Sequence, residues 1–322
     1  MKKLLYIFVF ASFFKAFSQD PIHTQFFMVP ETLSSSFTGA KQSTRAGIIH
    51  RTQWPGLNFS INTQFAFVDN WFEEVKSGIG ISILNHKETT TRYNFTQVNL
   101  NYAYHFPISD EWNVRPSISV GYGTKDFGFQ NLVLEDQINI FSGIINVNSI
   151  DPINLNETIR FLDFSTSVLL NSENSWVGLT VKHLNKPNIS MEMDGQNNLE
   201  MLMSLHGSVY VPFGNNRKYN KLFILANGMM QGKYNRFDFG AKYEMDRFAF
   251  GLLAATNPIK TDPNSHFLTS INAFVGMDWE GFRFGYSYDF NTTNIGRTGG
   301  VYELSISYNF NNNVNCFGCP DY

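Results

Sequence analysis

The sequence predicts an all-β chain that forms a single antiparallel transmembrane β-barrel of about fourteen strands, preceded by an N-terminal segment. Three observations lead there. Charged residues make up only 16% of the chain, against roughly 25% in ordinary soluble domains. Aromatic residues also make up 16%, and 32 residues are Phe. Polar and apolar residues alternate in segments close to the ~9–11 residues that a tilted strand needs to cross a bilayer.

The first eighteen residues have the features of a secretory signal. Lys2 and Lys3 precede an apolar stretch over 4–14, and Ala16 and Ser18 are small residues at the two positions that a signal peptidase reads. We therefore expect residues 1–18 to be a signal peptide. Residues 19–43 show no regular period, and we expect them either to plug the barrel lumen or to lie in the periplasm.

The alternation has a period of two residues. Over 282–290 every aromatic residue falls on one face, and Arg283, Ser287 and Asp289 fall on the other. Side chains along a strand point alternately to opposite faces, so this is a strand pattern. The aromatic face suits lipid and the polar face a lumen. An open sheet would leave unpaired edge groups in hydrocarbon at several kcal/mol each, so the sheet must close, with the last strand pairing with the first.

Fourteen strands, an even number, fit a single-chain outer-membrane barrel. The two longest gaps, 125–157 and 185–200, follow odd-numbered strands, and connections after even-numbered strands reach about seven residues at most. Long outer loops and short periplasmic turns are typical of such barrels. We therefore expect a barrel over 44–310, periplasmic termini, and a periplasmic tail over 311–322. The predicted strands span 44–54, 57–69, 77–87, 93–106, 112–124, 158–170, 174–184, 201–212, 220–231, 234–245, 246–257, 267–279, 280–290 and 300–310.

Motifs of catalysis and cofactor binding are missing from the sequence. There is no G-x-S-x-G, H-E-x-x-H, P-loop or G-x-G-x-x-G motif. Asp163, Ser165 and His183 could meet on neighbouring strands, as could many other trios. We expect no enzyme activity, no metal and no cofactor. The net charge of −3 excludes a strongly basic nucleic-acid binder.

Two regions are candidates for partner contacts. The long segment after the fifth strand contains Ile138, Phe141 and Ile144, which make it too apolar for a freely solvated loop. Met201 and Met203 flank the second long loop, either as a soft contact surface or as ordinary strand packing. The C-terminal pair Cys316 and Cys319 lacks a second pair of metal ligands, which leaves a local disulfide or an incidental role open.

Several short motifs then resemble one known family. The opening Gln19-Asp20-Pro21, followed by Thr24-Gln25-Phe26-Phe27, resembles the Q-D-P-x-x-S-Q-[FY] opening of the PorP/SprF family of type IX secretion system outer-membrane proteins. The family's N-P-A triplet is replaced here by Ser34-Ser35-Ser36, and the His before Glu303 by Tyr302. Further elements that resemble the family, in order, are Arg51-Thr52-Gln53-Trp54, Leu134-Glu135-Asp136-Gln137, His183-Leu184-Asn185-Lys186-Pro187, Gly285-Tyr286-Ser287-Tyr288-Asp289, Gly299-Gly300-Val301-Tyr302-Glu303-Leu304-Ser305 and Cys319-Pro320.

The resemblance implies a non-enzymatic, integral outer-membrane barrel that assists type IX export or surface anchoring of cargo such as gliding-motility adhesins. The implied partners are cargo C-terminal domains, secretion components and outer-membrane lipid. We expect the N-terminal residues Asp20, Pro21, Gln25, Phe26 and Phe27 to contact partners. The alternative is an outer-membrane transporter for hydrophobic small molecules. Its lumen should be apolar, whereas the predicted lumen face carries the charged side chains of Arg115, Asp289 and Glu303.

Overall fold

The structure is a computed structural model of the chain. The predicted signal peptide, Phe141, both cysteines and the tail except Pro320 lie outside the residues that it describes. The described residues are 19–57, 60–90, 92–127, 138–139, 144–145, 158–190, 195–212, 220–259, 266–293, 298–310 and 320.

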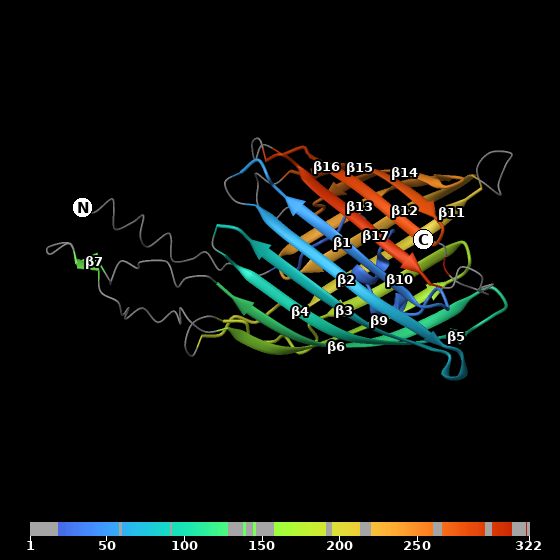
Figure 1. Cartoon of the computed structure of the whole chain (residues 1–322), viewed down its shortest axis with the longest axis horizontal. Coiled ribbons are helices and arrows are strands. Elements are labelled where there is room, and N and C mark those ends of the chain that lie inside the picture. Colours follow the sequence, from blue (N-terminus) through green and yellow to red (C-terminus); the bar gives the residue numbers. More distant parts are fainter. Residues whose placement is uncertain are drawn as a thin grey trace.

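Fourteen long antiparallel strands form a closed barrel (Figure 1). The predicted all-β barrel of fourteen strands is confirmed, and every strand boundary lies within four residues of its predicted position. The strands are β1 (Arg45–Gln53), β2 (Ile61–Phe72), β3 (Ser77–Glu88), β4 (Asn94–Tyr104), β6 (Asn113–Asp126), β9 (Ile159–Asn171), β10 (Ser175–Lys182), β11 (Leu202–Val211), β12 (Asn220–Gln231), β13 (Tyr234–Met245), β14 (Phe248–Thr256), β15 (Leu268–Trp279), β16 (Phe282–Asn291) and β17 (Val301–Asn309).

The first and last strands close the barrel. β1 pairs with β17 in a continuous register from Arg45 opposite Asn309 to Gln53 opposite Val301. On the far side, β4 pairs with β6, and the short β5 (Phe106–Pro107) extends that hairpin. Each of the fourteen strands is therefore hydrogen-bonded on both sides, which removes the free edges that a bilayer does not tolerate.

Alternation along the strands separates lipid-facing from lumen-facing side chains. On β3, Ile79, Ile81 and Ile83 are 41–51% exposed, whereas Ser82 between them is 5% exposed. On β16, Arg283 shares the lumen-facing side with Ser287 and pairs with Asp278 at the barrel end, as the period-two pattern predicted. Outward apolar groups thus cover the wall that faces hydrocarbon.

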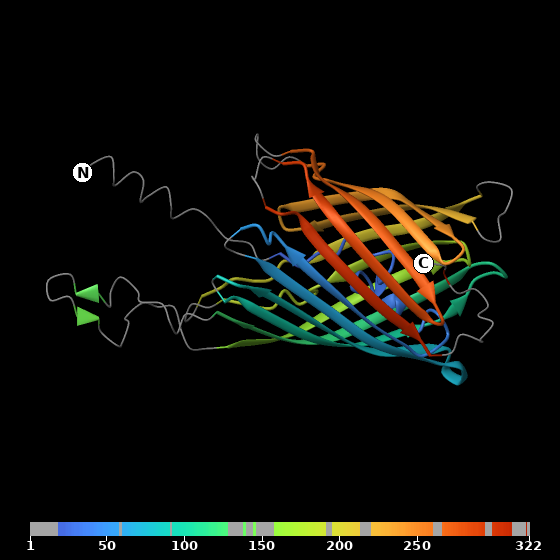
Figure 2. The same cartoon turned by 45° about the horizontal axis from the view of Figure 1, so that its top comes forward.

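The two mouths of the barrel differ in the length of their connections. The short-turn mouth holds the start of β1, the end of β17 and the turns that follow β2, β4, β9, β11, β13 and β15. Two of these turns, 105–112 and 212–219, have eight residues, one more than expected. At the opposite, long-loop mouth, residues 127–158 join β6 to β9 and residues 183–201 join β10 to β11. Figure 2 shows these strand ends at one end of the barrel. A short hairpin of β7 (Ile138–Asn139) and β8 (Ile144–Ile145) belongs to the connection between β6 and β9.

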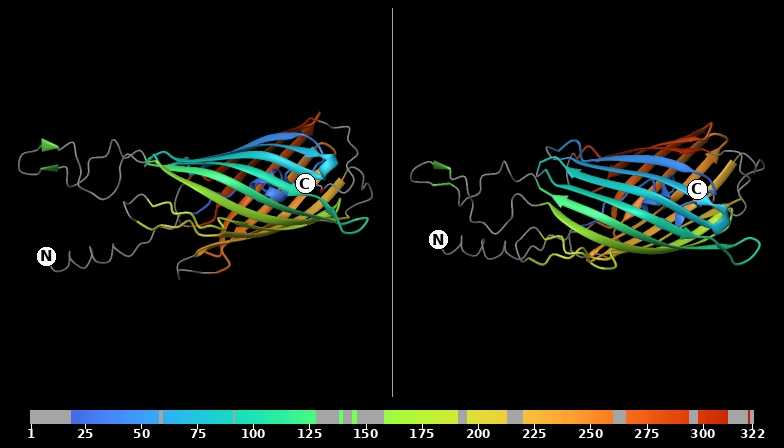
Figure 3. Two further views of the ribbon diagram at one scale, coloured as in Figure 1. Left: turned by 90° about the horizontal axis from the view of Figure 1, so that it is seen from below. Right: turned by 60° about the horizontal axis from the view of Figure 1, so that its bottom comes forward.

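Residues 19–43, which we call the lumenal segment, lie in the lumen and are surrounded by the barrel wall (Figure 3). They include two turns of 3-10 helix, η1 (Pro30–Thr32) and η2 (Ser35–Phe37). A third turn, η3 (Glu73–Val75), joins β2 to β3 outside the lumen. No helix in the described ranges is long and apolar enough to span a membrane.

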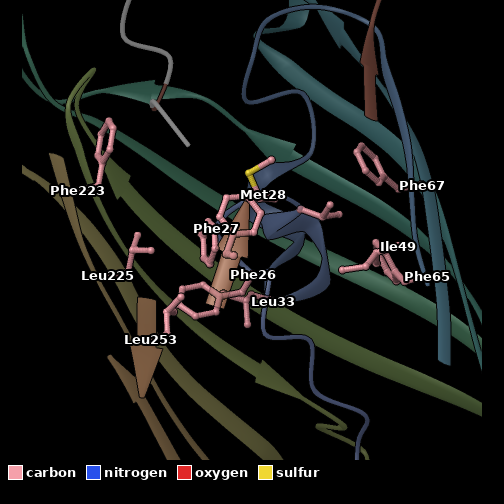
Figure 4. Close-up of a cluster of buried hydrophobic side chains, with 12 residues drawn as sticks. Phe26, Phe27, Met28, Leu33, Ile49, Phe65, Phe67, Phe223, Leu225 and Leu253 are labelled. Atoms are coloured by element: carbon pink, nitrogen blue, oxygen red, sulfur yellow. The ribbon is translucent and has the colours of Figure 1, made fainter. Parts of the chain in front are cut away.

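The hydrophobic core lies between the lumenal segment and the wall. Figure 4 shows Phe26 and Phe27 of the segment at the centre of side chains from strands on both sides of the barrel. A second, smaller cluster joins Phe37 to Trp176 of β10, whose rings meet edge to face at 5.1 Å. The barrel core is therefore completed by the lumenal segment. The main cluster contains Phe26, Phe27, Met28, Val29, Leu33, Ile49, Phe65, Phe67, Phe223, Leu225, Leu253 and Phe274.

A charge placed on the lipid-facing side of the wall should weaken the barrel. Leu304 lies mid-strand on β17 and is 51% exposed. Leu304→Arg should lower the free energy of unfolding in lipid vesicles by about 2–4 kcal/mol, measured by urea titration. Leu304→Phe, which keeps the face apolar, should stay close to wild type. Equal stability of the two variants would contradict the assignment of this face to lipid.

Candidate functional site: the lumenal segment and its seat in the wall

The centre of the site is the buried carboxylate of Glu303 on β17. It accepts hydrogen bonds from the main-chain nitrogens of Thr24, at 2.8 and 3.0 Å, and Gln25, at 2.9 Å. The Arg51 guanidinium of β1 donates to the same carboxylate and lies 3.7 Å from Asp289 of β16. A buried charge is costly unless it is paired and hydrogen-bonded, and here the segment supplies part of that compensation.

The side chain of Gln25 is recognised at both ends of its amide. Its nitrogen donates to Ser287 Oγ at 3.0 Å and to the Glu303 carbonyl at 2.9 Å, and its oxygen accepts from Ser305 Oγ at 2.6 Å. Thr24 Oγ1 donates to Asp289 at 2.8 Å. A carboxylate or an apolar group in place of the Gln25 amide could not make the same set of bonds.

Phe26 and Phe27 follow these hydrogen-bonded residues and are fully buried. Phe27 meets Phe274 of β15 edge to face at 4.9 Å, and Phe26 packs edge to face on Phe27 at 5.6 Å. Burying such a side chain contributes about 1.5–3 kcal/mol. Polar bonds thus fix the position of the segment, and apolar burial adds stability at the adjacent residues.

At the long-loop mouth, His183 ties the start of the lumenal segment to the wall. Its Nε2 lies 2.8 Å from Asp20, and its Nδ1 lies 3.0 Å from Asp163 of β9. The main-chain nitrogen of Asp20 also donates to Gln231 at 2.8 Å. Because carboxylates occupy both ring nitrogens, His183 has none left to act as a base for Ser165. Asp163, Ser165 and His183, the trio considered from the sequence, therefore do not form a catalytic triad.

Asp20 and His183 have shifted pKa values. Burial by itself would lower the pKa of His183, but Asp20 and Asp163 outweigh it and raise that pKa to about 9. Burial would raise the pKa of Asp20, but its attraction and hydrogen bond to His183 outweigh this and lower it to about 2. At neutral pH the contact is therefore an ion pair.

Toward the short-turn mouth, hydroxyl groups hold the segment. Ser34 Oγ donates to Ser167 Oγ of β9 at 2.9 Å, and Ser36 Oγ lies 2.9 Å from Ser117 Oγ of β6. The guanidinium of Arg115, also on β6, donates to the carbonyl groups of Ser36 and Thr38. The triplet Ser34-Ser35-Ser36, which departs from the family motif, thus has its own partners in the wall.

One contact near the end of the segment requires glycine on both sides. Gly39 has a φ of 66°, and a Cβ on Gly78 of β3 would lie 2.1 Å from the Thr38 carbonyl oxygen. Gly39 N donates to Asp69 at 3.0 Å. Only glycine permits so close an approach of two backbones. Beyond it, Lys41 donates to the carbonyl oxygen of Pro320, so the end of the C-terminal tail contacts the segment.

The motifs read from the sequence converge on this segment. The opening element supplies Thr24 and Gln25, and three distant elements supply Arg51, Asp289 and Glu303. The H-L-x-x-P element supplies His183. Sequence reasoning did not identify the wall contacts from β6 and β9. Their only signal was a polar residue on the lumen face, which many other positions share. The element at 134–137 lies outside the described residues.

The residues predicted to bind partners have different surroundings. Gln25, Phe26 and Phe27 are 0% exposed and contact the wall, whereas Asp20 and Pro21 are partly exposed. Met203 is 48% exposed on the lipid-facing side of β11. Met201, the residue that precedes β11, is half-buried. Ile138 and Ile144 lie in the β7–β8 hairpin, and Phe141 falls outside the description. Partner contacts by these residues stay a prediction.

The space beside the lumenal segment is lined by both polar and apolar groups. A cavity there is lined by the segment and by strands β2, β3, β4, β6, β9 and β10. Within the described residues, no group of three His, Cys, Asp or Glu side chains could hold a metal ion. Leu33, Phe65 and Leu84 form part of the apolar lining of the cavity. Its polar lining includes Asp20, His23, Gln97, Asn99, Asn101 and His183.

The closed register, the lipid-facing alternation and the occupied lumen define an integral outer-membrane β-barrel. The sequence matches the family described as "Type IX secretion system membrane protein PorP/SprF" over residues 15–308. The chain therefore belongs to the PorP/SprF family, as its motifs suggested.

Comparison with solved structures finds similar barrels at low identity. The outer membrane protein Omp33 of Acinetobacter baumannii is 8% identical, with a TM-score of 0.44, over 84% of this chain and 100% of that one. The CymD monoaromatic hydrocarbon channel is 12% identical, with a TM-score of 0.49, over 90% of this chain and 93% of that one. A search of curated proteins found no match. The strand register, rather than these similarities, establishes the barrel.

Removing the central charge should loosen the lumenal segment. Glu303→Gln leaves the Arg51 charge with Asp289 alone and should destabilise the seat by about 3 kcal/mol. The readout is maleimide labelling of Leu33→Cys, a buried position on the segment, with Cys316 and Cys319 replaced by Ser. Labelling should rise at least tenfold. Glu173→Gln, an exposed carboxylate in a short turn, is the control. Unchanged labelling of Glu303→Gln would contradict the role of Glu303.

The contact between Asp20 and His183 should depend on pH. The raised pKa of His183 means that its contribution is full below about 6.5 and is lost as pH rises through about 9. The lowered pKa of Asp20 means that its contribution is present above about 4 and is lost only as pH falls through about 2. Hydrogen exchange around residues 20–23, corrected for its intrinsic pH dependence, should therefore speed up between pH 7 and 10. Asp20→Asn should remove that change. Identical profiles would refute the ion pair.

Proposed function

We propose that this barrel serves type IX secretion as a non-enzymatic accessory that helps particular cargo proteins to be exported or anchored at the cell surface, gliding-motility adhesins among them. Cargo C-terminal domains and components of the secretion machinery are its partners. Its short turns and the end of its last strand face the periplasm, and its long loops lie outside the cell. In this orientation Asp20, which is bonded to His183 at the long-loop mouth, lies on the outer side, so only the C-terminal end keeps the expected periplasmic position. Family membership supports the secretion role, and the difference between short turns and long loops supports the orientation.

The observation that carries the proposal is that the chain fills its own lumen. Residues 26, 27 and 37 are completely buried against the wall, and Glu303 holds the preceding main chain. While the lumenal segment stays in place, a cargo protein cannot pass through this lumen. The barrel therefore acts by presenting its mouths and outer surface to cargo and machinery, and export itself proceeds through another component.

The buried seat also bears on the predicted partner residues. Gln25, Phe26 and Phe27 could reach a partner only if the lumenal segment left the barrel, whereas Asp20 and Pro21 lie partly exposed at the long-loop mouth. The β7–β8 hairpin belongs to the longest connection at that same mouth. We assign cargo contact to this mouth and contact with the secretion machinery to the short-turn mouth.

Transport of hydrophobic small molecules is disfavoured by the lumen itself. Arg51, Arg115 and Lys242 are each buried on the lumen side, together with carboxylates. A hydrophobic solute would have to cross these groups, and their burial leaves it no continuous apolar path. The wall thus supports the secretion role over the transporter role.

Loss of the protein should affect secretion selectively. In cells that lack it, one or a few surface proteins with a C-terminal sorting domain should accumulate in the periplasm, as measured by proteomics of surface, medium and periplasm. A chain whose residues 19–43 are deleted should conduct ions in planar bilayers, whereas the full chain should not. Unchanged secretion together with a defect in uptake of a hydrophobic solute would overturn the proposal in favour of a transporter.

A further inference from the structure

The outward-facing side chains at the long-loop ends of the strands divide the wall into two halves. On β1, β2, β3, β4, β6 and β9 these positions hold Thr52, Asn62, Lys87, Asn94, Asp126 and Arg160, all polar. On β11, β12, β16 and β17 the equivalent positions hold Met203, Met230, Phe290 and Tyr302, whereas β13 and β15 carry the polar residues Asn235 and Thr269 there. One side of the barrel thus carries a polar, cationic rim, and most of the opposite side is apolar or aromatic up to the rim.

The strand register places the cationic rim on one continuous surface. Lys87 lies opposite Asn94, Asn94 opposite Asp126, and Arg160 opposite Thr124 on the next strand. At a strand spacing of about 4.8 Å, four adjacent strands separate Lys87 from Arg160 by about 14 Å. Lys87 and Asp126 also line a shallow depression, to which Arg92 of the β3–β4 turn contributes.

The described residues of this rim carry a net positive charge. Lys87, Arg92 and Arg160 are exposed and form no ion pair among the described residues. Asp126 is the one carboxylate in the row, and it accepts a long hydrogen bond of 3.3 Å from Asn94. Three cations and one carboxylate leave this surface suited to a ligand with more than one negative charge.

Below the cations lies a row of neutral polar groups that includes Asn85, Thr96 and Thr124, and beyond it the same four strands present mostly apolar groups to the membrane. Among them, Leu100 on β4 is 57% exposed and Leu162 on β9 is 55% exposed, and Ile83 on β3 and Val120 on β6 lie on the same outward face. A ligand that matches the whole surface must carry hydrocarbon chains below and anionic groups at the rim. Basic residues placed at the end of an apolar band are a recognised way of binding phosphorylated lipid headgroups.

We propose that the outer face of β3, β4, β6 and β9 is a binding site for a phosphorylated lipid of the outer leaflet. Its acyl chains lie against the apolar strip, and its phosphate groups lie on Lys87, Arg92 and Arg160. This assignment depends on the orientation that places the long-loop mouth outside the cell. It goes beyond the secretion role, because it concerns the lipid-facing wall and a lipid ligand.

The test is binding of lipid A by the purified full-length barrel in detergent. Wild type should retain bis-phosphorylated lipid A in native mass spectrometry and bind dephosphorylated lipid A at least tenfold more weakly. The triple variant Lys87→Gln, Arg92→Gln and Arg160→Gln should lose about fivefold in affinity for each cation removed. Its unfolding temperature without lipid should match wild type, because all three side chains are exposed.

Arg247→Gln is the matched control, because Arg247 is an exposed cation at the short-turn mouth. It should bind lipid A as wild type does. The proposal is overturned if the triple variant binds lipid A normally, if wild type does not discriminate between the two lipids, or if Arg247→Gln causes the same loss. If the triple variant keeps lipid A but loses a co-purifying membrane protein, the surface is a protein interface and the lipid assignment is wrong.

Discussion

The buried carboxylate of Glu303 is the interaction on which the rest of the interior depends. It sits on the strand that closes the barrel, faces the lumen, and is shared between Arg51 of the first strand and the main chain of the lumenal segment. A carboxylate in this position without the segment would lose hydrogen bonds that it needs when buried. The charge that joins the first strand to the last therefore also positions residues 24 and 25, and through them the apolar core.

That core explains how a barrel of this size is filled. The lumen-facing side chains of the wall are mostly small or polar, so they do not meet across the interior. The lumenal segment brings Phe26, Phe27 and Phe37 to aromatic and aliphatic groups that the wall presents at only a few positions. Folding of the barrel and seating of the segment thus depend on the same contacts, although the segment is a separate stretch of chain.

The strands of the wall could be predicted from the sequence because alternate residues of every strand face lipid and the lumen, which favour different side chains. Lipid selects Ile79, Ile81 and Ile83 on one face of β3, while the lumen selects Ser82 on the other, and this contrast is visible in a single sequence. The closing pair of strands and the inward position of Arg283 follow from the same rule.

The position of the lumenal segment could not be predicted in this way. Its main contacts join residues about 280 positions apart, as in the bond between Thr24 and Glu303, and its own sequence has no period. The motifs indicated which residues matter, including Gln25 and Asp289, but not that they meet each other. The hydrogen bond between Ser36 and Ser117 was still harder to predict from the sequence, because several lumen-facing positions of the wall are serines.

The most direct test of the account is a cross-link between the segment and the wall. In a background with Cys316→Ser and Cys319→Ser, Ser36→Cys and Ser117→Cys replace hydroxyl groups that lie 2.9 Å apart. The account predicts that mild oxidation joins the two peptides within one folded chain, detected by mass spectrometry, and that Ser36→Cys paired with Ser172→Cys in a short turn gives no such product. Absence of the first cross-link in folded barrel, with Ser36→Cys freely labelled by a water-soluble maleimide, would contradict it.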